Sequence, residues 1–147
     1  MANEPDILKN IYDHPCLENI EINYPFVTVI ITNYNYSQYI TSCMESVARQ
    51  NYPHYRCLVV DDCSTDDSIE KINQFISNKD YNNKFSLIQH ETNGGQMAAF
   101  RTGLSHAEGA FIVYIDADDV IFEDFISAHV GYHLNSKIPI AFTSSNQ

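Results

Sequence analysis

Long apolar runs, paired cysteines and basic residues are all scarce in this chain of 147 residues. No stretch approaches the roughly 20 consecutive apolar residues that a membrane-spanning helix needs. The first ten residues, MANEPDILKN, lack the apolar segment of a secretory signal peptide. The four cysteines form no Cys-x-x-Cys pair, which argues against a zinc or thioredoxin-type site. We therefore expect a cytoplasmic protein with reduced thiols and no membrane span in this chain.

The shortage of basic residues leaves a strongly acidic chain, with 19 acidic against 8 basic residues and a formal net charge of −11. Nucleic-acid-binding proteins usually show the opposite balance, so no nucleic-acid partner is expected. Acidic residues gather in three short runs: Asp61, Asp62, Asp66 and Asp67; Asp116, Asp118 and Asp119; and Glu123 and Asp124. Clustered carboxylates favour a metal site, because hard cations prefer oxygen ligands.

Hydrophobic patterns alternate along the chain between strand-like and helical periods. Apolar, β-branched segments at 26–32, 55–60, 85–90, 111–115 and 138–143 are typical of buried strands. Apolar residues at helical spacing predict helices over 37–50, 69–76, 97–107 and 122–134. Ser37 is the predicted N-cap of the first helix, Ser64 to Asp66 are predicted to cap the second, and Gly109 is predicted to end the third.

This alternation predicts an α/β fold, a Rossmann-like, mostly parallel sheet with helices on both faces. Residues 1–24 show no clear period and are predicted to form an irregular leader. Residues 25–147 are predicted to form a single domain, because their length suits one ordinary hydrophobic core.

Polar side chains follow three of the predicted strands at the point where each strand ends. Thr32, Asn33 and Tyr34 end the first strand, Asp61-Asp62 end the second, and a run from Asp116 to Asp119 ends the fourth. Ligands of open α/β sheets bind at the carboxyl ends of strands, where the strand order reverses. With a strand order of 3-2-1-4, all three signals would border one solvated crevice. A Mg²⁺ or Mn²⁺ held there would let acidic side chains bind a diphosphate.

Some of these carboxylates also have simpler interpretations. Asp119 suits a cap of the following helix, and Asp61 suits a turn in which it accepts backbone N–H bonds. Asp66 and Asp67 suit the start of the second helix, where the dipole favours negative charge.

Four motifs occur in an order and spacing that match a known family: VTVIITNYN, VVDDCSTDD, HETNGGQ and IDADD. Over residues 26–126 the chain resembles the N-terminal half of family 2 glycosyltransferases of the GT-A fold. The resemblance implies a donor site for a nucleotide-diphosphosugar, usually a UDP-sugar, and inverting transfer of the sugar to an acceptor.

The resemblance also implies roles on the nucleobase side of that site. Thr32 and Tyr34 match the positions that flank the base, with Asn33 between them. Asp62 matches the carboxylate that pairs with the base, and Asp61 matches its structural neighbour.

On the diphosphate side, Asp116 and Asp118 match the Asp-x-Asp motif of the family. The resemblance implies that Asp116 lies near the ribose and that Asp118 holds the Mn²⁺ or Mg²⁺ that bridges the diphosphate, with Asp119 beside them. Gly95 lies in the Asn-Gly-Gly-Gln loop that opens the third helix. Arg101 departs from the family, which commonly has Asn there, and could offset diphosphate charge or be an exposed helix arginine.

The family places its acidic catalytic base far beyond the Asp-x-Asp motif, in an acceptor-binding half. We expect that half to be absent here, so that the chain is a donor-binding fragment whose catalytic base is not named. The resemblance leaves the sugar and the acceptor, a glycan, lipid or protein, open. The full-length enzyme could lie at the periphery of a membrane.

Two other functions remain open from the sequence. One is a non-catalytic module that binds a nucleotide-sugar or another partner. The other is a haloacid-dehalogenase-type phosphatase, in which Asp116 would be the nucleophile and Asp118 the general acid–base. That phosphatase family carries its Asp-x-Asp-x-Val motif on the first strand, whereas here the motif follows the fourth.

Overall fold

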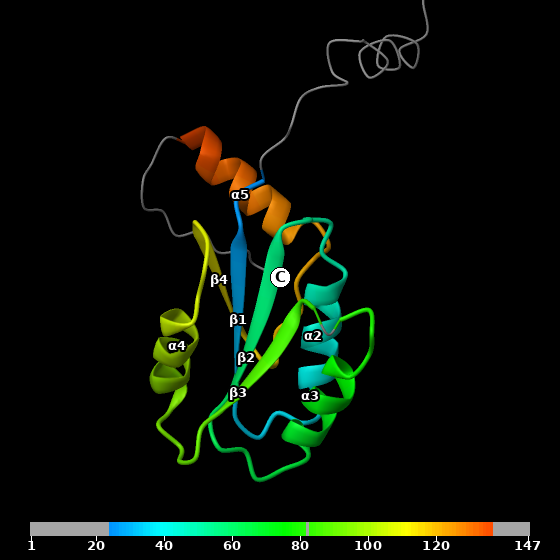
Figure 1. Cartoon of the computed structure of the whole chain (residues 1–147), viewed down its shortest axis with the longest axis vertical. Helices are drawn as coiled ribbons and strands as arrows, with labels where there is room; N and C mark the ends of the chain where they lie inside the picture. The colour runs from blue at the N-terminus through cyan, green and yellow to red at the C-terminus, as the bar shows by residue number, and fades with distance from the viewer. Residues whose placement is uncertain (1–23, 82, 137–147) are drawn as a thin grey trace, which may run out of the picture.

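The computed structural model describes residues 24–81 and 83–136 (Figure 1). Strands and helices alternate along this part of the chain: β1 (Val27–Asn33), α2 (Ile40–Ala48), β2 (Tyr55–Asp61), α3 (Ser68–Ile76), β3 (Phe85–Gln89), α4 (Gln96–Ser105), β4 (Phe111–Asp116) and α5 (Phe125–Ser136). The predicted strand at 138–143 and nearly all of the predicted leader lie outside the described residues. Each predicted strand and helix within the described ranges is present, with ends that shift by a few residues.

The described strands form one parallel sheet in the order β3-β2-β1-β4, which is the order that the sequence analysis assumed when it placed the polar strand ends at one crevice. All seven residues of β1 are buried. β1 therefore lies in the interior of the sheet, and the strand order reverses between β1 and β4.

Helices cover both faces of the sheet, with α4 on one face and α2 and α3 on the other (Figure 1). Alternate residues of β1 point to opposite faces, as the period of a strand requires. Val27, Val29 and Ile31 belong to the larger core cluster, which includes residues of α2, α3 and α5. Ile30 belongs to a smaller cluster with Val60 and Ala99 under α4.

Gly103 lets α4 approach the sheet closely, since a Cβ added there would lie 2.5 Å from Cγ2 of Ile30. We expect Gly103→Ala to lower the free energy of unfolding by about 1–3 kcal/mol, because overpacking outweighs the better helix propensity of alanine. Urea unfolding checks this. The control is Gly131→Ala in α5, where an added Cβ meets nothing within 4 Å. Gly131→Ala should leave stability unchanged or raise it, and equal effects of the two variants would contradict the packing argument.

The prediction that Ser37 caps the first helix is wrong. α2 begins at Ile40, and Tyr39 stands at its N-cap position without a side-chain hydrogen bond. The backbone N–H of Ser37 donates instead to Oδ2 of Asp66 at 2.9 Å, and Lys71 Nζ donates to the Ser37 carbonyl at 2.7 Å. These long-range bonds hold the segment before α2 against the start of α3, which a local capping rule does not take into account.

The predicted end of the third helix at Gly109 is also wrong, because α4 ends at Ser105. Gly109 has a φ of 89°, and a Cβ there would collide with the backbone of Phe26. A glycine is therefore required at position 109 because the backbone passes close to Phe26 just before β4, and not because a helix ends there.

Within the described residues, none of the helices has both the length and the apolar content needed to span a membrane.

Candidate functional site

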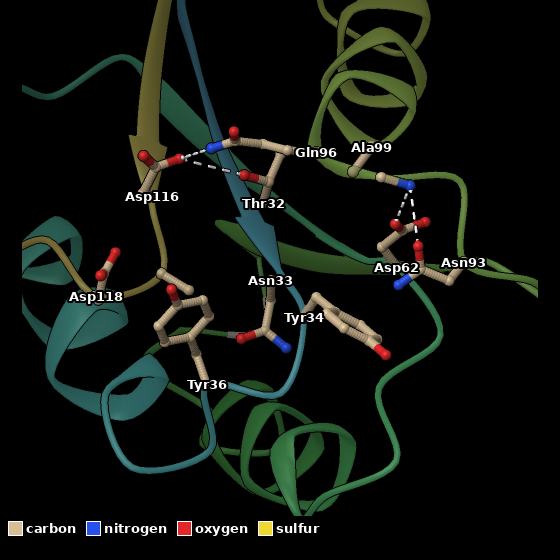
Figure 2. A pocket seen from close by; sticks show the side chains of 12 residues that line it. Thr32, Asn33, Tyr34, Tyr36, Asp62, Asn93, Gln96, Ala99, Asp116 and Asp118 are labelled. Atoms are coloured by element: carbon tan, nitrogen blue, oxygen red, sulfur yellow. Dashed lines mark hydrogen bonds between the residues drawn. The ribbon is translucent and has the colours of Figure 1, made fainter.

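A pocket of about 390 Å³ opens at the carboxyl ends of β1, β2 and β4, beside the start of α4 (Figure 2). It lies where the strand order reverses, which is the position expected for a ligand site in an open α/β sheet. Its lining consists of Thr32, Asn33, Tyr34, Tyr36, Asp62, Asn93, Gly95, Gln96, Ala99, Asp116, Ala117 and Asp118.

The structure brings most of the predicted site residues to this pocket. Those that line it are Thr32, Asn33, Tyr34, Asp62, Gly95, Asp116 and Asp118. Three predicted residues, Asp61, Arg101 and Asp119, are not part of its lining. Arg101 is exposed on α4, in agreement with the simpler of its two interpretations.

The ends of β1 and β4 are joined by a chain of polar contacts on one wall of the pocket. Thr32 pairs with Asp116 in the sheet register, and its Oγ1 lies 3.5 Å from Asp116 Oδ1 and 2.9 Å from the Tyr114 hydroxyl. Gln96, the first residue of α4, donates from Nε2 to the same Asp116 oxygen at 2.6 Å. No sequence pattern predicted a role for Gln96, because its contact joins residues of two elements that are 20 positions apart.

Negative charge accumulates around the loop that follows β4. Burial raises the pKa of the Asp119 carboxyl, and the nearby charges of Asp118 and Asp116 raise it further. The pKa of the Cys43 thiol is raised to about 12, mainly by burial and further by the negative charges of Asp119, Asp118 and Asp116. A cation bound in this loop would relieve the repulsion among these carboxylates.

The protein side chains alone do not form a complete metal site. Among the described residues, no group of three or more His, Cys, Asp or Glu side chains is placed to hold a metal ion. Asp118 is exposed at the pocket and could contribute one carboxylate, with Asp116 nearby. This donor set fits Mg²⁺ or Mn²⁺, since such ions are commonly held by one or two carboxylates together with water and substrate phosphates.

Asp61 stabilises the loop after β2 rather than lining the pocket. It is fully buried and accepts hydrogen bonds from Asn33 Nδ2 at 2.7 Å and from the backbone N–H and hydroxyl of Ser64 at 2.8 and 2.5 Å. Its turn interpretation is therefore the one the structure supports. Ser64 lies in this loop and does not cap α3, whose first backbone N–H, at Ser68, donates to Asp66 at 2.9 Å.

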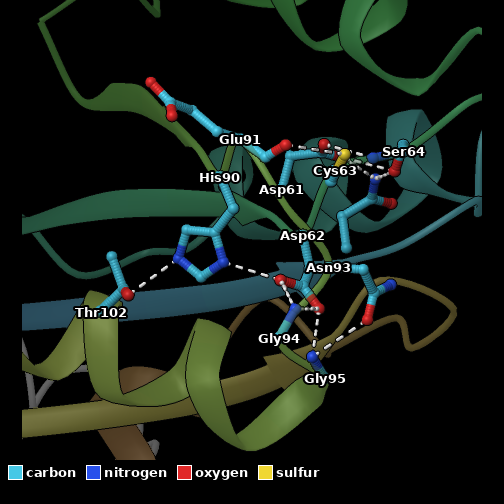
Figure 3. Close-up of polar contacts among 11 residues, drawn as sticks. Asp61, Asp62, Cys63, Ser64, His90, Glu91, Asn93, Gly94, Gly95 and Thr102 are labelled. Atoms are coloured by element: carbon cyan, nitrogen blue, oxygen red, sulfur yellow. Dashed lines mark hydrogen bonds and ion pairs between the residues drawn. The ribbon is translucent and has the colours of Figure 1, made fainter.

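Asp62 lies at the pocket, but the expectation that its side chain faces a solvated crevice is wrong. The residue is 2% exposed, and its carboxylate accepts hydrogen bonds from three donors (Figure 3). The backbone N–H groups of Gly94 and Gly95 lie 2.9 and 2.6 Å from its oxygens, and His90 Nδ1 lies 2.7 Å away. These bonds hold the Asn-Gly-Gly loop at the start of α4.

His90 was missed by the sequence analysis, although it contacts a predicted site residue. It follows β3 and lies 28 positions from Asp62 in the sequence, so no local spacing pattern connects the two. The only sequence signal available was a polar residue at the carboxyl end of the third strand.

Two carboxyl groups should make the fold sensitive to acid. Burial alone would raise the pKa of Asp62, but bonds from Gly94, His90 and Gly95 outweigh it and lower that pKa. Asp66 behaves likewise, because bonds from Ser68 and Ser37 outweigh its burial. A carboxyl group whose pKa is lower in the folded state than in the unfolded state stabilises the fold at pH values above its unfolded-state pKa of about 4. This stability is lost as the pH falls toward and through the folded-state pKa.

We therefore expect the free energy of unfolding to fall as the pH is lowered below about 5, and Asp66→Asn to reduce that slope. Urea unfolding at a series of pH values measures both. The exposed Asp80→Asn serves as the control and should leave the slope unchanged. An identical slope for Asp66→Asn and the unmodified chain would contradict the assignment.

Exposed aromatic side chains flank the pocket on the side of β1. Tyr34 is 44% exposed and Tyr36 is 38% exposed, and both rings border the opening (Figure 2). The loop that carries them is fixed by Asn35, which has a φ of 58° and accepts a bond from the Thr65 N–H at 2.8 Å. An exposed ring on a fixed loop suits stacking against a planar ligand group.

Comparisons with known proteins agree with this arrangement. A family model described as glycosyl transferase family 2 matches residues 28–142. The chain is 38% identical over 99 residues to a poly(ribitol-phosphate) β-N-acetylglucosaminyltransferase, TarS of Staphylococcus aureus, and this match covers 64% of the chain and 16% of TarS. The chain spans less than half the length of the curated relatives it matches.

Solved structures resemble the described fold as well. A crystal structure of residues 1–349 of TarS with UDP-GlcNAc superposes with a TM-score of 0.67 at 31% identity, covering 75% of this chain and 31% of that crystallised TarS chain. A mannosyltransferase from Pyrobaculum calidifontis, in complex with GDP-Man and Mn²⁺, superposes with a TM-score of 0.69 at 28% identity. That match covers 76% of this chain and 33% of the mannosyltransferase.

Proposed function

The chain belongs to glycosyl transferase family 2, and on that basis we propose that its pocket binds a nucleotide-diphosphosugar donor together with a divalent cation. The expected GT-A fold is confirmed by the structural matches. The observation that carries the proposal is the pocket itself, which joins Tyr34 and Asp62 on one side to Asp116 and Asp118 on the other. A ligand with a base at one end and a diphosphate at the other suits this separation of groups.

Asp62 suits the role of a base-recognising acceptor. An ionised carboxylate offers about four lone-pair sites. His90, Gly94 and Gly95 provide three donors, and the Gly94 N–H is shared between the two oxygens, at 2.9 and 3.1 Å. The weaker of these two contacts is the one that an N–H of a nucleobase such as uracil would replace. The exposed ring of Tyr34 beside it would stack on the base.

Asp116 and Asp118 suit the ribose and diphosphate part of the donor. Asp116 is fixed by Thr32 and Gln96, so its carboxylate is oriented to accept a ribose hydroxyl. Asp118 is exposed and would hold Mn²⁺ or Mg²⁺. When bound, such a cation neutralises diphosphate charge and stabilises the nucleoside diphosphate as a leaving group.

The three acidic side chains that line the pocket all have roles toward the donor in this proposal. We infer that the base that deprotonates the acceptor hydroxyl lies outside the described residues. TarS is named as an N-acetylglucosaminyltransferase and its structure holds UDP-GlcNAc, which supports a UDP-sugar donor for this chain.

Of the two alternative functions left open by the sequence, one is excluded and one remains. The phosphatase is not retained, because the chain belongs to a glycosyltransferase family and the Asp-x-Asp motif follows the fourth strand, at one edge of the described sheet. A non-catalytic donor-binding module shares the proposed pocket and is distinguished only by transfer to an acceptor.

Calorimetric titration of the chain in Mn²⁺ tests the ligand class. We expect UDP to bind more tightly than uridine by about ten-fold or more, because the diphosphate adds charged contacts. ADP and inorganic diphosphate serve as controls for the base and for the diphosphate alone, and each should bind more weakly than UDP. Equal binding of UDP, ADP and diphosphate would exclude base recognition, and no binding of any of them would contradict the proposal.

A further inference from the structure

His90 connects three elements at the side of the pocket. It follows β3, its Nδ1 lies 2.7 Å from Oδ1 of Asp62 at the end of β2, and its Nε2 lies 2.8 Å from Oγ1 of Thr102 on α4 (Figure 3). The side chain is only 18% exposed, so water competes little for these two bonds.

The partners of His90 fix the position of its proton. An ionised carboxylate only accepts hydrogen bonds, so the Nδ1 that faces Asp62 must carry hydrogen. In the neutral ring Nε2 is then an acceptor, and the Thr102 hydroxyl donates to it. The ring is thus held at both ends, with its N–H directed at the carboxylate.

We propose that His90 is a positioning residue of the nucleotide site, orienting the Asp62 carboxylate toward the base. The inference rests on the proposed function of the pocket. Asp62 in turn accepts the N–H groups of Gly94 and Gly95, and Gly95 and its neighbours Asn93 and Gln96 line the pocket. The bonds therefore run from Thr102 through His90 and Asp62 to the loop at the pocket wall.

Orientation matters here because Asp62 has few acceptor sites left. His90 and Gly94 both donate to Oδ1, while Gly94 and Gly95 both contact Oδ2. If the bond from His90 were lost, the carboxylate could turn, and the oxygen that meets the base would no longer be fixed toward the pocket. A base N–H would then have to reorganise the carboxylate when it binds, which weakens binding.

Two substitutions separate this role from a merely structural one. In asparagine, Nδ2 is two bonds from Cβ, as Nδ1 is in histidine, so His90→Asn keeps a donor toward Asp62 and loses the Thr102 bond. In glutamine, Nε2 is three bonds from Cβ, as Nε2 is in histidine, so His90→Gln keeps a group near Thr102 and loses the donor toward Asp62. Both variants remove the ring and one hydrogen bond, so similar losses of stability are expected.

Nucleotide binding should separate the two variants. At a temperature where both are folded, we expect His90→Gln to bind UDP about ten-fold more weakly than the unmodified chain in Mn²⁺, because a bond to a charged acceptor is lost. His90→Asn should remain within about two-fold, since Asp62 keeps its donor. Uridine without metal should show the same ranking, because the affected partner is the base.

A ligand-free measurement reports on the same carboxylate. The chain has five glycines, so labelling with ¹⁵N-glycine gives five backbone amide signals. The amides of Gly94 and Gly95 both donate to Asp62 and should exchange slowly in the unmodified chain and in His90→Asn. In His90→Gln they should exchange faster, while the Gly103 and Gly131 amides serve as internal references for global stability.

The outcomes distinguish this inference from the proposed function. Weaker UDP binding and faster Gly94 and Gly95 exchange in His90→Gln alone support the positioning role. If the two variants lose affinity equally, or neither loses any, His90 does not position Asp62 and the inference is wrong. If the unmodified chain binds UDP but the exchange rates of the two variants match, the inference again fails while the proposed function stands. If the unmodified chain binds no nucleotide, the proposed function fails, and the inference that rests on it fails too.

Discussion

Asp118→Asn is expected to weaken UDP binding in Mn²⁺ by about ten- to a hundred-fold, while uridine affinity stays nearly unchanged. The proposed partner of Asp118 is the cation, so removing its charge affects only the part of the ligand that the cation contacts. The side chain is exposed at the pocket, so the variant should fold as the unmodified chain does. Calorimetry with UDP and with uridine measures the two affinities.

Asp119→Asn provides the matched control, since it removes one carboxylate of the same loop. Asp119 is exposed and does not line the pocket. Partial desolvation of its carboxyl and the charges of Asp118 and Asp116 raise its pKa, so removing its charge also relieves repulsion. We expect at most a small change in UDP affinity for this variant. A loss as large as that of Asp118→Asn would show that general negative charge, and not Asp118, attracts the cation.

Asp62→Asn should weaken the binding of both UDP and uridine, and it should also destabilise the fold by about 2–3 kcal/mol. The amide that replaces one oxygen would place a donor against two of the donors: Gly94 and either His90 or Gly95. Because the residue is buried, water cannot restore the lost bonds. Urea unfolding gives the stability, and titration at a temperature where the variant is folded gives the two affinities.

Asp67→Asn is the control for stability, since Asp67 is exposed and makes no side-chain cap bond at the start of α3. It should change the free energy of unfolding little. If Asp62→Asn and Asp118→Asn show the same binding profile for uridine and UDP, the assignment of separate base and cation roles is wrong.

The parallel α/β sheet and the location of the pocket could be predicted from the sequence because both follow from strong, local signals, whereas the strand order had to be assumed. β-branched runs such as that of β1 are typical of buried strands, and alternation with helices favours a parallel sheet. Polar residues directly after these strands, such as Thr32 and Asp116, must then meet at one edge. The structure places them there, with paired register between the two.

Contacts across elements could not be predicted in the same way. Gln96 reaches Asp116, and His90 reaches Asp62, through side-chain geometry that depends on how α4 and β3 are placed. Ser37 failed as a cap because Asp66 and Lys71 bind its backbone from α3 and the turn before it. Burial of Asp62 was missed for a related reason, since the loop that covers it lies about 30 positions away.

The central claim is that a divalent cation joins a nucleotide diphosphate to the carboxylates that follow β4. The most direct measurement is calorimetric titration of UDP into the unmodified chain, first in Mn²⁺ and then after the metal is removed with a chelator. We expect UDP affinity to fall by about ten-fold or more without metal, while uridine affinity does not change. Equal UDP affinity with and without metal would contradict it.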